Sequence, residues 1–318
     1  MRKCYGGIDL GGTFIKAGLL SRDGRRIARS KISTEVDSGV AAVEANLLKA
    51  GRRLCDLAAR RKLKLAGIGI GSPGTVKYPE GIITGSSPNI PGWVGSNMRN
   101  LFSGFPIPVS GDNDANCMGL AESMFGAGKG TKSGFYLTIG TGIGGALVVN
   151  GSLVRGASFA AGEYGHTIFK YGGIKYKTGQ RGPLEAYVAA PALIKQTKEA
   201  VRKAKKSILT GNLNSLTPED IFEAFTSGDR AAVESVSRNA EMIGVAIGSI
   251  VNLLNPEVVV IGGGMSKGGA KYIELIRKAA KSFAFDSATS ILKIKVARFG
   301  NDAGWIGAAC LNILKDGD

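Results

Sequence analysis

The chain has 318 residues, of which 44% are hydrophobic and 21% charged, and 41 Lys and Arg against 25 Asp and Glu give a formal net charge of +16. This is the composition of a globular protein, and its 48 glycines follow no collagen-like period. The length exceeds what one core usually supports, which predicts two domains, and no apolar stretch reaches the roughly 20 residues that span a membrane.

The first half of the chain alternates strand-like and helical patterns, which predicts an α/β architecture. A strand, a tight glycine turn and a second strand are predicted within residues 6–20. An amphipathic helix is predicted over 40–62, and a buried strand over 65–71. Residues 82–93 read as a loop rich in proline and glycine. A helix is predicted to begin within 112–116, where Asx residues can cap it.

The second half repeats the strand, glycine turn and strand pattern within residues 135–149. Two such hairpins suggest two similar halves around a cleft. Helices are then predicted over 184–206, 217–226, 229–254, near 268–283 and over 302–314, with strands over 257–261 and near 291–299.

The turn of the first hairpin, Asp9-Leu10-Gly11-Gly12-Thr13, is the most informative motif of the chain. Its glycines permit positive φ and let the backbone approach a ligand closely. Asp9 can hold a metal ion through water, and Thr13 supplies a hydroxyl. The combination suits a metal-bound polyphosphate.

The second turn, Gly140-Thr141-Gly142-Ile143-Gly144-Gly145, formally matches a dinucleotide fingerprint. The segment after it reads as a strand rather than a helix, which argues against a Rossmann site and for a hairpin whose N–H groups hold phosphate. An ordinary glycine-rich hairpin is the alternative. Gly262-Gly263-Gly264 follows a buried strand, and its lack of side chains would let a flat base or ribose lie against the backbone.

Polar side chains cluster in Asp112-Asn113-Asp114-Ala115-Asn116, directly after an apolar strand. A helix cap explains one of them, whereas a carboxylate that accepts a hydroxyl proton explains the cluster better. Glu163, His166 and Glu185 supply further groups suited to sugar hydroxyls, and Asn89 offers another polar contact. Taken singly, each of these is better explained as a surface or structural residue.

Seven motifs in one order resemble the ROK family of repressors, uncharacterised reading frames and sugar kinases. They run over most of the chain: Asp9-Leu10-Gly11-Gly12-Thr13, Gly71-Ser72-Pro73-Gly74, Pro88-Asn89-x-x-Gly92-Trp93, Asn113-Asp114-Ala115-Asn116, Gly140 to Gly145, Gly162-Glu163-Tyr164-Gly165-His166 and Asn255-Pro256-Glu257 through Gly264. The resemblance implies an actin-like ATPase (ribonuclease H-like) fold with two domains around a cleft. We expect a small domain of 1–112 plus about 302–318, and a large domain of 113–301.

The resemblance also implies residue roles in transfer of the ATP γ-phosphate to a sugar hydroxyl. Asp114 is the expected general base. The expected sugar ligands are Asn89, Asn113, Glu163, His166 and Glu185. Phosphate and Mg²⁺ are expected near Asp9, Gly11, Gly12, Thr13, Lys16, Gly140, Thr141 and Gly142, with Asp9 holding Mg²⁺ through water or phosphate, and adenosine near Gly262, Gly263 and Gly264.

One segment departs from the family pattern. Members usually carry a zinc-binding Cys-x-Cys-Gly-x-x-Gly-Cys-x-Glu after the histidine, and here Tyr176, Thr178 and Pro183 occupy the three cysteine positions. Zinc needs about four ligands, and only His166 remains, so no structural zinc is expected. The substitution bears on the placement of His166 and Glu185.

The first expectation is therefore an ATP-dependent kinase that phosphorylates the 6-hydroxyl of glucose or a related hexose, in a homodimer. One alternative is a kinase for an N-acetylhexosamine, on which Tyr164 would bear. Another is a sugar-sensing transcriptional regulator, but the first hairpin begins too close to Met1 for a preceding DNA-binding domain.

Charge and cysteines bound the remaining possibilities. The basic clusters lack a recognition helix, zinc finger or basic-aromatic alternation, so we read them as solvated helix faces and expect neither a nucleic-acid nor a membrane partner. Four scattered cysteines suit buried thiols, and a single histidine excludes a multi-histidine metal site. The start of the chain meets Asp9 too early for a signal peptide, so a cytoplasmic location is expected.

Overall fold

The computed structural model describes residues 1–85, 87 and 89–316, which form two compact units. Unit 1 comprises Met1–Lys132, Ala146–Gly162 and the segment from Arg298 onward, and unit 2 comprises Ser133–Gly145 and Glu163–Ala297. The α/β class is confirmed. The expected domain boundaries at 112/113 and 301/302 stay a prediction.

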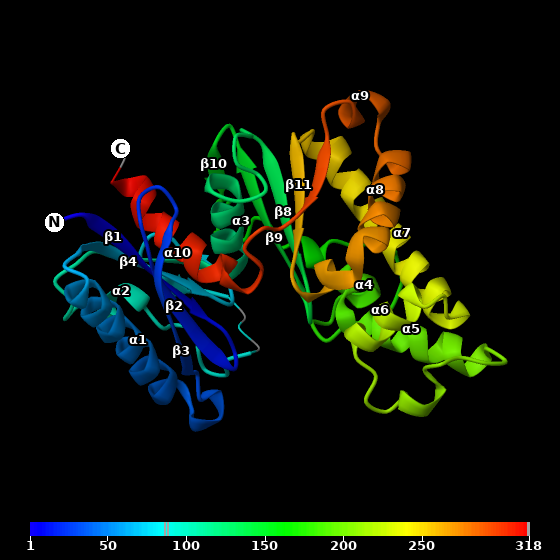
Figure 1. The fold of residues 1–318 in the computed structure, drawn as a ribbon, viewed down its shortest axis with the longest axis horizontal. Coiled ribbons are helices and arrows are strands. Elements are labelled where there is room, and N and C mark those ends of the chain that lie inside the picture. The colour runs from blue at the N-terminus through cyan, green and yellow to red at the C-terminus, as the bar shows by residue number, and fades with distance from the viewer. Residues whose placement is uncertain (86, 88, 317–318) are drawn as a thin grey trace. The chain divides into compact units, whose positions relative to one another are not determined.

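The regular elements alternate along the chain (Figure 1). The strands are β1 (Lys3–Leu10), β2 (Phe14–Leu20), β3 (Arg26–Ser33), β4 (Lys64–Ser72), β5 (Val76–Lys77), β6 (Ile82–Ile83), β7 (Val109–Asn113), β8 (Gly134–Ile139), β9 (Ile143–Val149), β10 (Ser152–Val154), β11 (Val258–Gly262) and β12 (Lys293–Val296). The α-helices are α1 (Val40–Arg60), α2 (Met98–Leu101), α3 (Asp114–Met124), α4 (Glu185–Val188), α5 (Ala190–Lys203), α6 (Pro218–Thr226), α7 (Arg230–Leu254), α8 (Gly269–Phe283), α9 (Asp286–Thr289) and α10 (Ala303–Lys315). Short 3-10 helices lie at Val36–Ser38, Tyr164–His166, Thr210–Asn212, Gly264–Gly268 and Gly300–Asp302.

Unit 1 is built on a sheet with the strand order β3-β2-β1-β4-β7. The first three strands pair antiparallel, whereas β1, β4 and β7 run parallel. A Cβ on Gly6 would meet Leu54 of α1, and a Cβ on the next residue, Gly7, would meet Trp305 of α10. Since successive strand residues point to opposite faces, α1 and α10 cover opposite faces of this sheet.

Helix α10 lies unusually close to the sheet and to α3. A Cβ on Gly7 would stand 1.8 Å from the Trp305 carbonyl oxygen, and one on Gly69 would stand 1.7 Å from that of Ala308. On the helix itself, a Cβ on Gly307 would stand 1.5 Å from the Cys117 carbonyl oxygen of α3. These three positions require glycine because backbone packs directly on backbone there.

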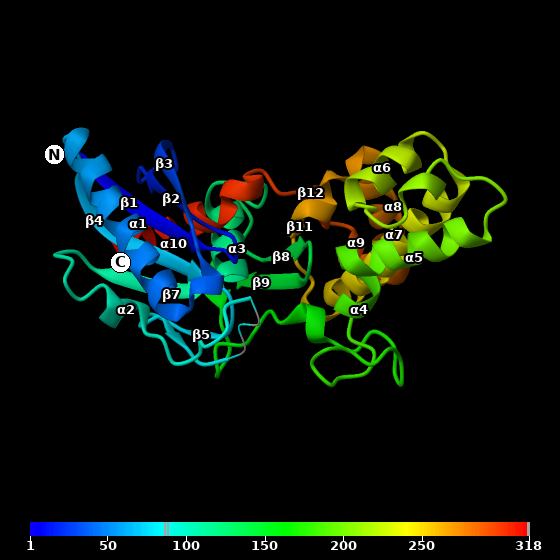
Figure 2. The same cartoon turned by 90° about the horizontal axis from the view of Figure 1, so that it is seen from below.

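The second sheet has the order β10-β9-β8-β11-β12, and β11 pairs parallel with both β8 and β12. Within unit 2 the long helices α5, α6, α7 and α8 gather together (Figure 2). Helices α7 and α8 approach closely at Gly244 and Gly248, where Cβ atoms would stand 2.3 Å from the Ala279 Cβ and 2.9 Å from the Phe283 Cβ.

Most predicted elements occur within a few residues of their expected positions. The third strand of the first sheet, β3, was not predicted. The helix expected over 184–206 is broken at Ala189, whose backbone is extended and caps α5. Pro191 then lies in the first turn of α5, where its missing N–H needs no partner. Among the helices of residues 1–85, 87 and 89–316, none has both the length and the apolar character that a membrane crossing requires.

The contact between β4 and α10 leads to the first prediction. Gly69→Ala should lower the free energy of unfolding by about 3 kcal/mol, because overpacking typically costs about 1–3 kcal/mol and here only backbone can yield. Urea unfolding measures the loss. Gly104→Ala is the matched control, because nothing lies within 4 Å of a Cβ at Gly104. Equal midpoints for the two variants would contradict the packing argument.

Candidate active site

In unit 1 the predicted site residues lie at the carboxyl ends of three neighbouring parallel strands. Asp9 of β1 is in register with Gly71 of β4, and Gly71 is in register with Asp112 of β7. Ser72 and Asn113 form the next pair. Ligands of α/β sheets bind outside this end of the strands, so three motifs far apart in sequence meet where a ligand site is expected.

Asp9 is a largely buried carboxylate. Its Oδ2 lies 3.8 Å from the Nζ of Lys16, which also donates to the Asn301 carbonyl oxygen at 3.3 Å. Burial raises the pKa of Asp9, and Lys16 opposes that rise. The carboxylate rests against the first turn of α10, where a Cβ on Gly304 would stand 2.5 Å from the Asp9 Cγ. Gly304 thus makes room for the predicted metal-binding group.

The turn after Asp9 uses its glycines differently from the prediction. Neither Gly11 nor Gly12 has a left-handed φ, so the expected use of positive φ is wrong here. Gly11 donates its N–H to the Phe14 carbonyl oxygen at 3.1 Å, and a Cβ would stand 2.9 Å from that oxygen. Gly12 lies beside Asn89, whose Cβ is 3.7 Å from where a Gly12 Cβ would be. Thr13 is exposed next to them. The glycines serve close approach alone.

Asn113 caps α3, and Asp114 is the first residue of that helix. The Asn113 Oδ1 accepts the N–H groups of Ala115 at 2.9 Å and Asn116 at 3.1 Å, and its Nδ2 donates to the Gly74 carbonyl oxygen at 3.0 Å. An amide has two donor hydrogens and two lone pairs, so one N–H of Asn113 remains for a ligand. Asp114 is exposed, and its Oδ1 also accepts from Ala115 at 2.8 Å.

Behind this helix start lies a buried ion pair that the sequence analysis did not identify. Asp112 is fully buried, and its Oδ2 accepts from the Nε and Nη2 of Arg155, each at 2.7 Å. Its Oδ1 accepts the Asn113 N–H at 2.8 Å and the Asn116 Nδ2 at 2.9 Å. The Arg155 guanidinium also lies 3.7 Å from the Tyr78 ring centroid. Asp112 therefore holds the segment that carries Asn113 and Asp114.

The loop that carries Asn89 is fixed by a buried tryptophan. Trp93 is fully buried, and its Nε1 donates to the Ser72 Oγ at 2.9 Å. Asn89 itself is exposed. Pro88, which belongs to the same predicted motif, lies outside the described residues. Trp93 thus ties this loop to the carboxyl end of β4.

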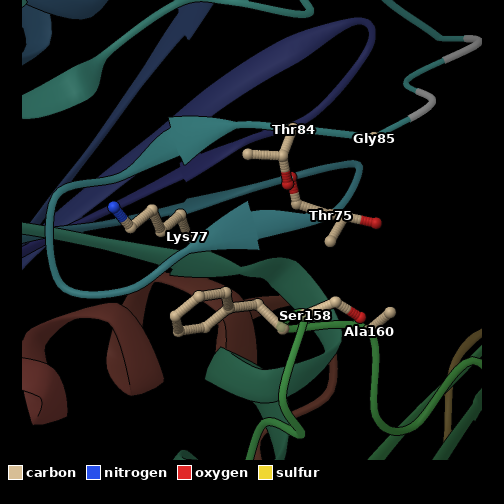
Figure 3. Close-up of a pocket in the computed structure, with 7 residues that line it drawn as sticks. Thr75, Lys77, Thr84, Gly85, Ser158 and Ala160 are labelled. Atoms are coloured by element: carbon tan, nitrogen blue, oxygen red, sulfur yellow. The ribbon is translucent and has the colours of Figure 1, made fainter.

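A pocket of about 440 Å³ opens in unit 1 next to these residues. Figure 3 shows Thr75, Lys77 and Thr84 on one side of it and Ser158 and Ala160 on the other. Small-molecule sites commonly have volumes of roughly 300–1,000 Å³. Thr75 directly follows Gly74, which accepts the hydrogen bond from Asn113. The pocket is lined by the Phe159 side chain as well as by these hydroxyl groups and the Lys77 ammonium group.

In unit 2 the two glycine segments predicted for nucleotide lie side by side. Gly262 at the end of β11 is in register with Thr138 of β8, just before Gly140. Gly263 has φ 81°, and a Cβ there would stand 2.3 Å from the Ile139 carbonyl oxygen. At Gly140 and Gly264 nothing lies within 4 Å of a Cβ position. The backbone at both places is open to a ligand. Thr141 is exposed between its glycines.

Glu185 lies buried beside the Gly140–Gly142 turn. Its Oε2 accepts the Ile143 N–H at 2.6 Å, and a Cβ on Gly142 would stand 2.7 Å from that oxygen. Its Oε1 accepts the Tyr176 hydroxyl at 2.5 Å and lies 3.6 Å from the Lys177 Nζ. The sequence analysis assigned no binding role to Tyr176 or Lys177.

Glu163 and His166 lie near each other, and His166 also contacts Gln180. The His166 Nε2 lies 4.0 Å from Glu163 Oε2, and the Nδ1 lies 3.2 Å from Gln180 Oε1. Thr178, at a position where the family pattern has a cysteine, donates to the same Gln180 oxygen at 3.3 Å. In the part of the chain that the structure describes, no three His, Cys, Asp or Glu side chains are grouped as metal ligands. The expected lack of zinc stays a prediction.

These arrangements can be set beside known proteins. A model of the ROK family matches residues 5–314. The chain belongs to the ROK family. It is 35% identical over 312 residues to the glucokinase of Halalkalibacterium halodurans, which covers 96% of the chain and 94% of the relative.

Solved ROK structures share the fold over the full length. A ROK glucokinase from Streptomyces griseus in complex with glucose and AMPPNP has a TM-score of 0.82 at 27% identity, covering 97% of this chain and 98% of that one. The ROK hexokinase from Thermus thermophilus has a TM-score of 0.83 at 31% identity, covering 99% of each chain. The expected actin-like ATPase fold is confirmed.

The family also includes proteins with other names. An N-acetyl-D-glucosamine kinase of Photobacterium profundum is 32% identical over 98% of this chain and 100% of its own length. A xylose repressor of Caldicellulosiruptor bescii is 31% identical over 78% of this chain, and that match covers 63% of the repressor. The sugar kinase class is therefore common to the full-length relatives named here, while the individual sugar differs.

Because Asp9 is buried, we expect that replacing it with asparagine stabilises the protein, and that the gain in stability depends on pH. A carboxyl whose pKa is higher in the folded than in the unfolded chain destabilises the folded state as pH rises above the ordinary value of 3.8. Asp9→Asn should therefore raise the urea midpoint at pH 7, and the gain should shrink toward pH 4. For Asp23, a hydrogen bond from Ser21 lowers the pKa, so Asp23→Asn should give no gain. A gain that is the same at both pH values would contradict the assignment.

Arg155 gives a second prediction for this site. Arg155→Met leaves the Asp112 carboxylate buried without its ion partner, which typically costs about 3–5 kcal/mol. Urea unfolding should show a loss of that size. Arg25→Met removes an ion pair of 2.9 Å with Asp23, but those side chains are 84% and 58% exposed, so the change should stay within about 0.5 kcal/mol. Similar losses in both variants would refute a special role for the buried pair.

Proposed function

We propose that this ROK protein transfers the γ-phosphoryl group of ATP to the 6-hydroxyl of glucose, with Asp114 as the general base. An ATP-dependent sugar kinase is the activity shared by its full-length glucokinase relatives. The observation that carries the residue assignment is the meeting of Asp9, Asn113 and Asp114 at the carboxyl ends of β1 and β7. Phosphoryl transfer requires mainly positioning and charge neutralisation. A carboxylate at Asp114 can help to position the hydroxyl, and a Mg²⁺ ion held by Asp9 would supply the neutralisation.

Asp114 suits the role of base because it is exposed on an element that cannot shift easily. Its backbone lies between the Asn113 cap and the Asn116 side chain, which Asp112 holds from behind. Geometry within hydrogen-bond reach of the reacting hydroxyl is the first requirement for a base. In the proposed step, Asp114 accepts the proton of the sugar hydroxyl as the hydroxyl oxygen bonds to the γ-phosphorus. The bond between that phosphorus and the β–γ bridging oxygen breaks, and ADP leaves.

Asp9 fits the metal-binding role assigned to it. Mg²⁺ is usually held by one or two carboxylates together with substrate phosphates and waters. Asp9 offers one carboxylate, and Gly12 and Thr13 of the turn that follows it are exposed. When bound, Mg²⁺ would neutralise charge on the transferring group. Lys16, which lies 3.8 Å from Asp9, is proposed to face phosphate as well.

The glycine segments of unit 2 fit a nucleotide. The open backbone at Gly140 and Gly264 provides surface that a side chain would fill. We assign Gly140, Thr141 and Gly142 to phosphate and Gly262, Gly263 and Gly264 to adenosine. The complex of the Streptomyces griseus glucokinase with AMPPNP supports a nucleotide site in the family.

The sugar is assigned to Asn89, Asn113, Glu163, His166 and Glu185. The glucose in the same Streptomyces griseus complex supports a hexose as substrate. A kinase for an N-acetylhexosamine is the second candidate, which the Photobacterium profundum relative supports. Tyr164 does not discriminate between them, because its side chain is buried and its hydroxyl donates to the Ala246 carbonyl oxygen of α7.

Turnover across a panel of hexoses and N-acetylhexosamines with Mg²⁺ and ATP tests the proposal. Glucose should give the highest kcat/KM, and Asp114→Asn should lower kcat by about 10²- to 10⁴-fold with little change in the KM for ATP, because general-base catalysis contributes that much. Asp37→Asn, which alters an exposed aspartate of the 3-10 helix Val36–Ser38, is the control.

A zinc chelator should leave the rate unchanged. Full activity in Asp114→Asn would rule out the base assignment, and a preference for an N-acetylhexosamine would favour the second candidate.

A further inference from the structure

We infer that Tyr176 is a positioning residue for sugar binding, which acts by fixing the Glu185 carboxylate. The inference rests on the proposed function, because Glu185 is a sugar ligand only there. Tyr176 lies in the loop 174–182, and no role in binding has been assigned to it above.

The Glu185 carboxylate is held from two directions within unit 2. The Ile143 N–H binds Oε2 at 2.6 Å from the side of the glycine turn. The Tyr176 hydroxyl binds Oε1 at 2.5 Å from the side of the loop. Hydrogen bonds to an ionised acceptor are short and strong. Because each oxygen of the carboxylate has one such donor, rotation about its terminal torsion would break both contacts.

The residues packed around Glu185 leave its carboxylate little room to move and form other hydrogen bonds. A Cβ on Gly142 would stand 2.7 Å from Oε2, and a Cβ on Gly165 would stand 3.3 Å from it. Gly165 also lies against the backbone of Ile143, where a Cβ would stand 2.7 Å from the Ile143 carbonyl oxygen. Both glycines thus lie beside Oε2, and the Tyr176 hydroxyl contacts Oε1.

Tyr176 is better suited than Lys177 to orient the carboxylate. The Lys177 side chain is 60% exposed and its Nζ is 3.6 Å from Oε1, so it contributes as a mobile surface charge. Tyr176 is half-buried, and its aromatic ring allows few rotamers. Burial, together with the hydrogen bond to Glu185, raises the pKa of the Tyr176 hydroxyl, so the group stays protonated and donates.

A carboxylate oxygen has two lone-pair positions. With one position on each oxygen occupied by Tyr176 and Ile143, the two others are left in fixed directions. Paired sugar hydroxyls would meet an acceptor whose orientation is already set, so that less orientational entropy is lost on binding. Loss of the Tyr176 hydroxyl should therefore weaken sugar binding and leave ATP binding alone.

The test is Tyr176→Phe, which removes the hydroxyl and keeps the ring. The KM for the preferred sugar should rise by about tenfold, the change expected when one hydrogen bond to a charged group is lost. The KM for ATP should change less than twofold. Tyr171→Phe is the matched control, because Tyr171 lies near the same loop and is 98% exposed. It should change neither constant.

A double-mutant comparison tests whether Tyr176 acts through Glu185. In a Glu185→Ala background, Tyr176→Phe should change the KM for the sugar less than twofold. An unchanged sugar KM in the single variant, or a tenfold rise in both backgrounds, would overturn the inference.

Sugar affinity by calorimetry separates this inference from the proposed function. A protein that binds a sugar without phosphorylating it contradicts the proposed function, and Tyr176→Phe should still weaken that binding. A protein that turns over glucose with equal sugar constants in the Tyr176 and Tyr171 variants contradicts only the inference. If no sugar of the panel binds or reacts, both are wrong.

Discussion

The arrangement of unit 1 depends on the close approach of helix α10 to backbone on two sides. On one side Gly7 and Gly69 admit its carbonyl oxygens, and on the other Gly307 admits the backbone of α3. The first turn of the same helix leaves a place for Asp9 at Gly304. Because α3 begins at Asp114, the single helix α10 sets the position of both Asp9 and Asp114, the carboxylates assigned to catalysis. Small side chains at the packed surface are therefore as necessary to the site as the polar residues themselves.

How much of the fold the sequence could predict depended on whether the signal was local. Strand β1 and helix α1 have clear apolar periods, and both occur as expected. Strand β3 was missed because it is an edge strand of alternating half-buried and charged residues, Arg-Ile-Ala-Arg-Ser-Lys-Ile-Ser, whose pairing with β2 follows from the sheet rather than from its own pattern. The break at Ala189 escaped prediction because proline is tolerated in a first helical turn as well as at a helix end.

The site shows the same division between local and long-range information. The glycine turns and the capped start at Asn113 are sequence-local, so their motifs were found. Their neighbours were not, because Arg155 pairs with an aspartate 43 residues earlier. Only the return of the chain after β10 brings the guanidinium to the buried carboxylate, and no spacing rule encodes that return. An unpaired buried charge is so unfavourable that the fully buried Asp112 required a partner, but the sequence contains 41 Lys and Arg among which to choose.

In the loop that follows His166, Tyr176 stands at a position where the family pattern has a cysteine, and its hydroxyl donates a hydrogen bond to the Glu185 carboxylate. A metal-held loop is ordered only while the ion is bound, and its ligands must lose protons. The contacts of Tyr176 with Glu185 and of Thr178 with Gln180 carry no such dependence. They are directional, however, and each involves a single donor. Backbone hydrogen bonds hold the loop as well, such as those from the Tyr176 N–H to the Gln180 carbonyl oxygen and from the Gly182 N–H to the Ile174 carbonyl oxygen. The Tyr176 hydroxyl adds a contact to a buried carboxylate. In the proposed sugar site, the orientation of the Glu185 carboxylate therefore depends on two donors, the Tyr176 hydroxyl and the Ile143 N–H.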